Sequence, residues 1–373
     1  MTHIEQMIQD MCPHGVEWKT IKETVGVNRG RRLTKSQLKE DGIYEVYHGS
    51  KDTPLGRYDE YNAPKDTIIV VNTGGIGGVK YLDRDFWCSD GSFWLGHSSG
   101  INNKFLYYFL SRYEDYFESQ KRVGGVPTID RNVVENFEIP IPPLEIQKKI
   151  VECLDKFSAL AAELQAELQL RRKQYEYYRT QLLTPHSDCN SATKPDDAQW
   201  EWKTLGEICE IRNGKDYKHL NDGKYPVYGS GGIMTYKDQY VYNKPSVLLP
   251  RKGSINKIHY VEEPFWNVDT AFYTIINESV VLPKYLFYYL STIDLAAYNT
   301  GTGAIPSLTQ TVLKALSIPL PSLAEQARIV SILDKFEALT TSLSDGIPAE
   351  QAMQQKRYEY YRDLLLTFPR QAV

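Results

Sequence analysis

Hydrophobic residues between Leu144 and Thr184 recur at alternating intervals of four and three. The large members of this series are Ile150, Leu154, Phe157, Leu164, Leu168, Tyr175, Tyr178 and Leu182, and no Gly or Pro interrupts the stretch. This spacing is typical of a helix with a coiled-coil seam, so we expect one helix over residues 144–184. A helix of about 40 residues would be roughly 60 Å long, and a partner must cover its apolar seam.

The same chain supplies a candidate partner, because the motifs around this helix occur twice. Three segments have close copies further along: 139–147 at 318–326, 154–157 at 333–336, and 174–179 at 357–362. We therefore predict a second helix over residues 322–367. Gly346 and Pro348 should interrupt it near 344–349, since both residues disfavour a continuous helix.

The repetition extends over nearly the whole chain, and a repeat of about half the chain indicates domain duplication. The anchors are Glu17–Thr20 with Glu201–Thr204, Tyr44–Tyr47 with Tyr225–Tyr228, Phe86–Asp90 with Phe265–Asp269, and Leu106–Leu110 with Leu286–Leu290. We predict an α+β fold with pseudo-twofold duplication. Two similar globular domains, 1–143 and 200–321, are separated by two long antiparallel helices that form an intramolecular coiled coil. The polar stretch 185–199 is the expected linker.

This arrangement resembles the specificity subunit of a type I restriction–modification enzyme. The resemblance covers residues 15–367 and rests on three motifs and their order: Tyr-Pro-Val-Tyr-Gly-Ser-Gly-Gly at 225–232, Ile-Pro-hydrophobic-Pro before each long helix, and Tyr-Glu-Tyr-Tyr-Arg near the end of each. It implies a non-catalytic subunit whose two domains each read one half of a split DNA site. The helices would set the spacer between the half-sites and dock two methylation subunits. S-adenosylmethionine would belong to the methylation subunits. ATP and Mg would belong to motor-nuclease subunits, which would attach through the methylation subunits.

Candidate DNA contacts follow from polar and cationic residues in predicted loops, where such side chains can reach phosphates or base edges. In the first domain these are Arg29, Arg31, Arg32, Lys51, Asn72 and Thr73; in the second they are Lys215, Lys218, Ser230, Arg251, Lys252 and Asn256. An ordinary solvated loop remains the alternative for each of them. The glycines of Asn72–Val79 follow a predicted buried strand, but the segment lacks the Gly-Lys-Ser/Thr of a nucleotide-binding loop.

Composition limits the other possibilities. The net charge is −4, residues 1–143 carry 17 Lys and Arg against 20 Asp and Glu, and residues 185–320 carry 13 against 14. Because DNA-binding modules are usually basic, a partner is expected to supply part of the positive surface. The five Cys lack metal-ligand spacing, and neither a signal peptide nor a membrane-spanning run is evident, so we expect a cytoplasmic protein without its own metal or catalytic site.

Two other classes stay open from the residues alone. One is a non-catalytic adaptor that binds protein or carbohydrate, which the 27 Tyr and the acidic balance would suit. The other is a self-contained DNA methyltransferase, which the missing methylation motif opposes.

A further expectation concerns Ala161–Leu164 and Gln165–Leu168, a near-perfect four-residue repeat. It resembles the short repeat at which members of the family vary in length, although chance in a helix rich in Leu, Ala and Glu also explains it.

Overall fold

The computed structural model describes all residues except 1–2, 123–124, 186–199, 302–305, 342–345 and 372–373. The chain divides into two compact units, which we call unit 1 (Met1–Leu164 with Gln351–Val373) and unit 2 (Gln165–Glu350). Because these units divide the long helices, the domain boundaries drawn from the sequence remain predictions. The expected linker, apart from Pro185, lies outside the described residues.

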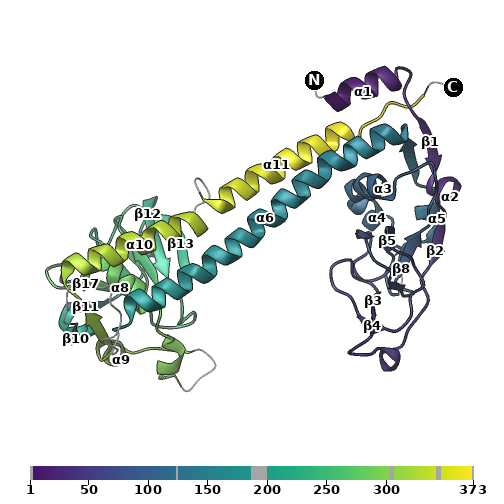
Figure 1. Cartoon of the computed structure of the whole chain (residues 1–373). Coiled ribbons are helices and arrows are strands. Elements are labelled where there is room, and N and C mark those ends of the chain that lie inside the picture. Colours follow the sequence, from purple (N-terminus) through teal and green to yellow (C-terminus); the bar gives the residue numbers. More distant parts are fainter. Residues whose placement is uncertain (1–2, 123–124, 186–199, 302–305, 342–345, 372–373) are drawn as a thin grey trace, which may run out of the picture. The chain divides into compact units, whose positions relative to one another are not determined.

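Unit 1 contains a four-stranded sheet of order β2-β8-β5-β6, a three-stranded sheet of order β4-β3-β7 and the pair β1-β9. Strands β3 to β8 follow one another without a helix between them, and α3, α4 and α5 lie between β8 and β9 (Figure 1). The elements are α1 His3–Met11, β1 Glu17–Thr20, α2 Ile21–Thr24, β2 Val27–Arg29, η1 Lys35–Gln37, β3 Tyr44–Tyr47, β4 Gly56–Tyr58, β5 Thr67–Val71, β6 Val79–Leu82, β7 Trp87–Cys88, β8 Ser92–Leu95, α3 Asn103–Leu110, η2 Ser111–Tyr113, α4 Glu114–Ser119, α5 Arg131–Glu135 and β9 Glu138–Ile141.

Unit 2 repeats this topology strand for strand. Its sheets have the orders β11-β17-β14-β15, β13-β12-β16 and β10-β18. The elements are β10 Glu201–Thr204, α7 Leu205–Ile208, β11 Cys209–Asn213, β12 Asp222–Gly229, β13 Gly232–Lys237, β14 Ser246–Pro250, β15 His259–Val261, β16 Trp266–Asn267, β17 Ala271–Ile276, α8 Pro283–Leu290, η3 Leu295–Tyr298, α9 Gln310–Lys314 and β18 Ser317–Leu320. The predicted α+β duplication is therefore confirmed.

Local sequence signals explain how both copies begin. Thr20 and Glu23 form a capping box at α2, and Thr204 and Glu207 form the same box at α7. Each box satisfies backbone N–H groups that a helix start otherwise leaves without partners. The preceding strand then pairs with the strand that leads into the long helix, with Trp18 opposite Pro140 and its copy Trp202 opposite Pro319.

The long helices follow the predicted pattern with one correction. Helix α6 is continuous over Leu144–Leu183, one residue short of the predicted end. The second helix comprises α10 (Leu323–Thr341) and α11 (Ile347–Leu365), so residues 347–349 are helical and were wrongly included in the interruption. Pro348 lies in the first turn of α11, where a backbone N–H would have no partner within the helix, so its missing N–H costs nothing.

Within each unit, segments of the two long helices share one hydrophobic core. In unit 1 the core contains Leu154 from the beginning of α6 and Leu365 from the end of α11. In unit 2 it contains Leu183 from the end of α6 and Leu333 from the beginning of α10. The beginning of each long helix thus packs with the end of the other, which is the expected antiparallel pairing. The seam residues Leu164 and Leu168 are also buried, at 7% and 5% exposure.

A buried glutamine attaches each long helix to its domain. The Gln147 side chain accepts from the N–H of Asn102 at 2.7 Å and donates to the carbonyls of Pro142 and Gly100 at 2.7 and 3.2 Å. Its copy Gln326 accepts from the N–H of Leu282 and donates to the carbonyls of Val280 and Pro321 at 2.8–3.1 Å. Both glutamines are fully buried, so the three bonds of each satisfy groups that water cannot reach.

A duplicated aspartate makes the second attachment. Asp155 accepts from the Tyr108 hydroxyl at 2.6 Å and pairs with Lys104 at 2.8 Å. In unit 2, Asp334 accepts from the Tyr288 hydroxyl at 2.5 Å and pairs with Lys284 at 3.0 Å. Helices α3 and α8 are therefore held on the long helices by the same chemistry. Of the helices that the structure describes, none combines the length and the apolar character needed to cross a bilayer.

Candidate nucleic-acid interface

In unit 1, backbone hydrogen bonds bring together loops that are far apart in the sequence. The Gly91 carbonyl accepts from the N–H groups of Asn72 and Thr73 at 3.0 and 3.3 Å, just beyond the end of β5. The Cys88 carbonyl accepts from the Arg31 N–H at 2.8 Å, which holds the basic segment beside the same turn. The Ile129 N–H then donates to the Asn72 carbonyl at 3.0 Å and adds a further loop.

Unit 2 builds the same assembly from different residues. The Thr270 carbonyl accepts from the N–H groups of Arg251 and Lys252 at 2.9 and 3.1 Å, beyond the end of β14. The Lys215 N–H donates to the Asn267 carbonyl at 2.7 Å, and the Leu308 N–H donates to the Arg251 carbonyl at 2.9 Å. Arg251 and Lys252 thus occupy the positions that Asn72 and Thr73 occupy in unit 1.

We call this assembly the loop platform. In unit 1 it consists of residues 29–32, 48–51, 72–78 and 125–130; in unit 2 it consists of residues 213–218, 229–232, 251–257 and 306–309. Its backbone is shared by both units, whereas side chains at equivalent positions differ, as Asn72 and Thr73 differ from Arg251 and Lys252. A rigid framework that carries variable loops is a common solution for specific recognition.

The duplicated tryptophan pair holds the basic segment in each platform. The Trp87 indole N–H donates to the Arg31 carbonyl at 2.7 Å, and the Trp266 indole N–H donates to the Lys215 carbonyl at 2.9 Å. Both tryptophans are almost fully buried, so they position the backbone and leave the cationic side chains free to extend outward. The retention of Phe-Trp in both halves was the signal in the sequence for this packing role.

Six of the predicted contact residues are exposed cations in loops of the platform or at its edge. Within the described part of the chain, their side chains make no ion pair or side-chain hydrogen bond: Arg29, Arg31, Arg32, Lys215, Lys218 and Lys252. Ser230 and Thr73 are half-exposed on the same platforms. These eight side chains are available to a ligand without breaking an existing contact.

The other four candidates are engaged within the protein. Lys51 pairs with Glu114 at 2.5 Å, and Asn72 is only 7% exposed. The Arg251 guanidinium donates to the Asp269 carbonyl at 3.1 Å. The Asn256 amide donates to Asp294 and accepts from the Ala296 N–H, so it supports the turn of η3. Whether these residues touch DNA stays a prediction; their structural contacts could not be deduced from residue type and loop position.

The glycine loop Asn72–Val79 is a tight turn whose amides are used internally. The N–H groups of Gly75, Gly77 and Gly78 donate to the carbonyls of Gly49, Val71 and Gly75 at 2.8–3.2 Å. At Gly74, with φ of +88°, a Cβ would lie 2.5 Å from the Gly49 carbonyl oxygen. The glycines therefore serve close packing between two platform loops, which agrees with the absence of a nucleotide-binding motif.

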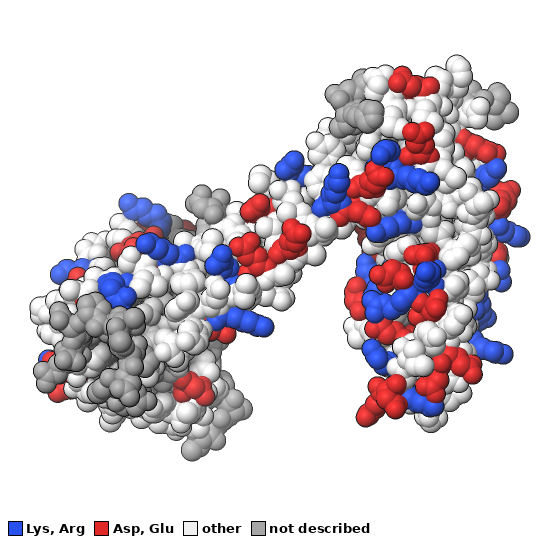
Figure 2. All heavy atoms as spheres, in the orientation of Figure 1, with Lys and Arg blue, Asp and Glu red and all other residues white. Residues whose placement is uncertain are grey.

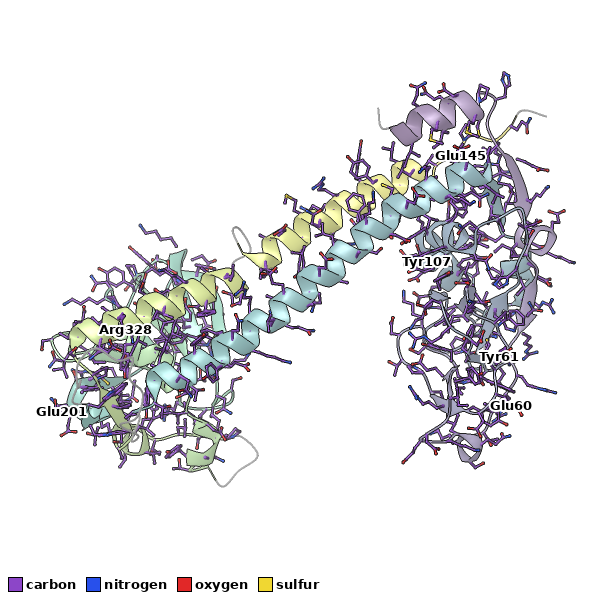
Figure 3. The ribbon with its side chains drawn as sticks, in the orientation of Figure 1. Glu60, Tyr61, Tyr107, Glu145, Glu201 and Arg328 are labelled. Carbon is purple, nitrogen blue, oxygen red and sulfur yellow. The ribbon has the colours of Figure 1, made fainter. Side chains whose placement is uncertain are left out.

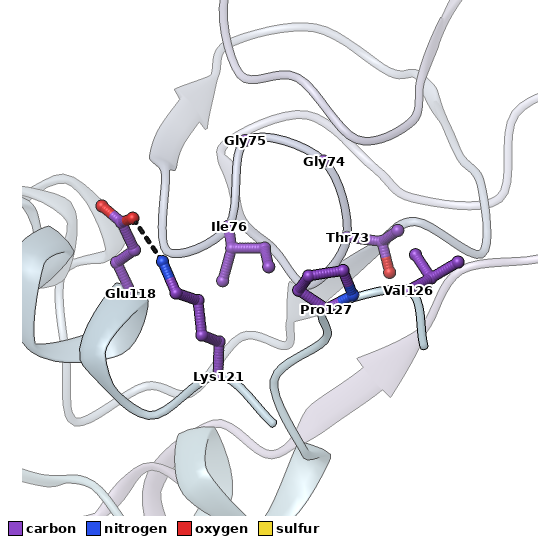
Figure 4. A pocket seen from close by; sticks show the side chains of 8 residues that line it. All are labelled: Thr73, Gly74, Gly75, Ile76, Glu118, Lys121, Val126 and Pro127. Atoms are coloured by element: carbon purple, nitrogen blue, oxygen red, sulfur yellow. Dashed lines mark hydrogen bonds and ion pairs between the residues drawn. The ribbon is translucent and has the colours of Figure 1, made fainter. Parts of the chain in front are cut away.

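A pocket of about 430 Å³ lies beside this turn in unit 1 (Figure 4). Thr73, Gly74, Gly75 and Ile76 line one side, and Val126 and Pro127 line another. Glu118 and Lys121, which form an ion pair at 2.8 Å, complete the lining of this open pocket. The mixture of apolar, backbone and paired charged groups provides no anion site of its own.

Positive and negative side chains are mixed on the face of the protein that Figure 2 shows, where Lys and Arg lie among Asp and Glu. Ion pairs such as Arg131 with Glu135 and Arg212 with Glu210, both at 2.8 Å, illustrate this mixing. Short loop segments such as 29–32, with three arginines, are the local concentrations of positive charge that the sequence analysis singled out.

Comparison with known proteins identifies the class. A family model described as type I restriction modification DNA specificity domain matches residues 13–170 and again 198–350, and the chain belongs to this family. It is a specificity subunit with two copies of the domain, and it is not the catalytic component. This finding excludes the adaptor and the self-contained methyltransferase as classes for the chain.

Individual relatives agree with this assignment. The chain is 30% identical to the type I restriction enzyme EcoR124I/EcoR124II specificity subunit of Escherichia coli, over 99% of this chain and 98% of that protein. It is 31% identical to the EcoprrI specificity subunit of Escherichia coli, over 76% of this chain and 74% of that protein. The crystal structure of the S subunit of a type I restriction–modification system from M. genitalium has the same fold, with a TM-score of 0.65 and 22% identity over 94% of this chain and 96% of that one.

Sequence reasoning missed one duplicated surface feature. Leu170 and Tyr177 on α6 are 55% and 61% exposed, and their copies Met353 and Tyr360 on α11 are 53% and 64% exposed. Residues seven apart lie on the same face of a helix. Each unit therefore displays one apolar pair, which we call the exposed stripe. The signal that could have revealed it is a large apolar residue outside the heptad seam at equivalent positions of both helices.

Proposed function

We propose that each unit reads one half of a bipartite DNA site through its loop platform. The observation that carries the proposal is that the two platforms share a backbone framework but present different side chains at equivalent positions, Asn72 and Thr73 in one and Arg251 and Lys252 in the other. Two such readers in one chain fit a site with two unrelated half-sequences. Arg31, Arg32 and Lys252 are placed to donate to guanine edges or phosphates, and Ser230 and Thr73 can donate to or accept from either.

The long helices provide the spacer and the docking faces in this proposal. Helix α6 runs without a break over its 40 residues, so its length can set the spacing between half-sites. The exposed stripes offer two equivalent apolar surfaces, Leu170 with Tyr177 and Met353 with Tyr360, each exposed by at least half. Equivalent surfaces in both units suit two copies of one partner, which we take to be the methylation subunit.

The chemistry is assigned to partner subunits. S-adenosylmethionine would bind the methylation subunits, and ATP and Mg would bind motor-nuclease subunits attached through them. Among the described residues, no group of three or more His, Cys, Asp or Glu side chains is arranged to hold a metal ion. We place the assembled complex in the cytoplasm, where the DNA of a bacterial cell is accessible.

Binding measurements on the isolated chain and on its complex test this assignment. Because each domain is close to neutral, the chain alone should neutralise few phosphates and bind DNA weakly, whereas the complex with two methylation subunits should bind a split site tightly. Gel-shift titrations at physiological salt, with and without the co-expressed methylation subunit, measure the difference. Tight sequence-specific binding by the isolated chain would contradict the proposed division of labour.

Docking on the exposed stripes has its own test. Replacing Leu170 and Tyr177 by Ala should reduce the methylation subunits bound per chain from two to one, as should replacing Met353 and Tyr360. Changing all four should remove both. Native mass spectrometry of the co-expressed complex reports the stoichiometry, and Leu339→Ala, a 37% exposed leucine of α10, is the matched control. Retention of two partners by the fourfold variant would eliminate the stripes as docking faces.

A further inference from the structure

Unit 2 carries a hairpin that has no counterpart of equal size in unit 1. Strands β12 and β13 contain 8 and 6 residues, whereas the equivalent β3 and β4 contain 4 and 3. A turn at Ser230 and Gly231 joins them, with Gly229 paired to Gly232. A Cβ at Gly231 would meet nothing within 4 Å, so the tip of this hairpin extends into open space.

The outer strand of the hairpin presents apolar side chains to solvent on both of its faces. Ile233, Met234 and Tyr236 are 49%, 56% and 50% exposed. Neighbouring residues of a regular strand point to opposite faces, so one face is normally buried. Three exposed large apolar residues within four positions are unusual for a strand of a soluble domain.

A β-bulge explains the exposure of Met234. Ile233 pairs with Tyr228 and Thr235 pairs with Val227, which leaves Met234 as an extra residue in β13. Bulges bend the strand and redirect a side chain, and they are common beside functional sites. The equivalent pairing of β3 with β4 runs without a register shift. The hairpin of unit 2 therefore differs from its copy by length, by irregularity and by apolar exposure.

The edges of the two hairpins also differ. In unit 1 the N–H of Lys39 donates to the Arg57 carbonyl of β4 at 2.9 Å. The aromatic pair beside each hairpin is the same in both units: Tyr61, which Figure 3 labels, packs on Tyr44 with ring centroids 5.1 Å apart, and Tyr240 packs on Tyr225 at 5.0 Å. The segment that carries Lys39 therefore covers the edge of the unit 1 hairpin. Strand β13 is an edge of its sheet, and among the described residues no strand pairs with its outer side. An uncovered apolar edge is normally avoided because it promotes association, so its retention here indicates a ligand.

The hairpin is continuous with the loop platform of unit 2. The Ser230 N–H donates to the Thr270 hydroxyl at 3.3 Å, and the Thr270 carbonyl accepts from the N–H groups of Arg251 and Lys252. A Cβ at Gly253 would lie 3.3 Å from the Ser230 hydroxyl, so the hairpin tip adjoins the loop that carries Lys252. His259 lies against Tyr228 at the same tip, and burial lowers the pKa of its imidazole.

We propose that the β12–β13 hairpin enters the major groove of the second half-site and that Ile233, Met234 and Tyr236 read base edges there by apolar contact. The major groove admits a two-stranded β-ribbon, and the thymine methyl group is the apolar feature that such side chains recognise. This inference rests on the proposed function and deepens it. Unit 2 would read its half-site by apolar contact, whereas unit 1, whose hairpin is short and covered, would rely on its polar platform.

The test uses the complete complex with its methylation subunits. Changing Ile233 and Met234 to Ala should reduce discrimination roughly fivefold or more at one or two positions of the second half-site, since a good base contact contributes about that much. The first half-site and the spacer should stay unchanged. Sequencing of modified adenines in cells measures all three. The matched control is Leu55→Ala, in the hairpin loop of unit 1 and 37% exposed, which should leave the second half-site as it is.

A second measurement tests the proposal without depending on assembly of the double alanine variant. A photo-cross-linking amino acid at Tyr236 should cross-link the complex to DNA inside the second half-site, and uracil in place of thymine there should weaken binding by the wild-type complex. Unchanged specificity in the double variant, or cross-links only outside the half-site, would overturn the hairpin proposal and leave the proposed function intact. A change in both half-sites would instead count against modular reading by the two units.

Discussion

Phe336 of α10 stacks on Tyr178 of α6, with ring centroids 5.5 Å apart and planes inclined by 29°. The repeat reproduces this pair in unit 1, where Phe157 stacks on Tyr361 at 5.5 Å and 27°. Phe157 and Phe336 end the duplicated Leu-Asp-Lys-Phe motif, which lies near the beginning of each long helix. Tyr178 and Tyr361 belong to the duplicated Tyr-Glu-Tyr-Tyr-Arg motif, which lies near the end of each long helix. Each unit is therefore completed by the helix end of the other half of the sequence, which explains why both motifs are duplicated.

Removal of this stacking should destabilise the unit in which it occurs. Phe336→Ala should lower the free energy of unfolding by about 2–3 kcal/mol, less than for a fully buried Phe because the ring is half-exposed. Urea unfolding of the purified chain measures the change, and Leu339→Ala on the same helix should cost less than about 1 kcal/mol. Equal effects of the two variants would show that the stacked pair has no special role.

The buried glutamines should contribute more through hydrogen bonds than through packing. Gln326→Leu preserves most of the volume but leaves the Leu282 N–H and two carbonyls without partners, so it should cost about 3 kcal/mol. Gln147→Leu should cost a similar amount in unit 1, and Gln239→Leu, at an exposed position, should be neutral. The comparison uses the same unfolding assay, and a loss below about 1 kcal/mol for both buried variants would contradict the anchoring role.

Alkaline pH should weaken unit 2 through a buried thiol. Burial raises the pKa of Cys209 from 9.0 to about 12, and its sulfur contacts the Leu205 carbonyl at 3.2 Å. The folded state thus keeps a proton that the unfolded state loses, and the stability present below pH 9 declines as pH rises toward 12. Cys209→Ala should reduce this slope by up to about 1.4 kcal/mol per pH unit. An identical slope in chemical unfolding of wild type and variant would refute the assignment.

The duplication made much of this architecture predictable from residues alone. The seam from Ile150 to Leu182 and the copies of Asp155, Gln147 and Phe157 indicated paired helices and two similar domains, because each motif makes the same contact twice. The loop sequences are less well repeated, so no second copy supports an interpretation of their contacts. Lys51 is paired with Glu114 and Asn256 supports η3, and these tertiary contacts depend on residues 63 and 38 positions away. The bulge at Met234 could not be predicted from the sequence either, since a register shift depends on how two strands pair.

The spacing role of α6 predicts the effect of a short insertion. Duplicating Gln165–Leu168 adds about 6 Å of helix, which corresponds to roughly one to two base pairs at ~3.4 Å each. The added stutter can be absorbed by local unwinding of the coiled coil. Both half-sites should stay the same while the unspecified spacer lengthens, as seen by sequencing modified adenines. An active variant with an unchanged spacer would defeat the ruler hypothesis.

The central claim is that each unit reads its own half-site, and exchange of one domain tests it most directly. Residues 200–317 would be replaced by the equivalent domain of another specificity subunit, with the duplicated motifs at both junctions retained. The hybrid would be expressed with its methylation subunit, and modified adenines would be mapped across the genome. We predict that one half of the recognised sequence changes to that of the donor while the other half and the spacer persist. Alteration of both halves in an active hybrid would contradict the account.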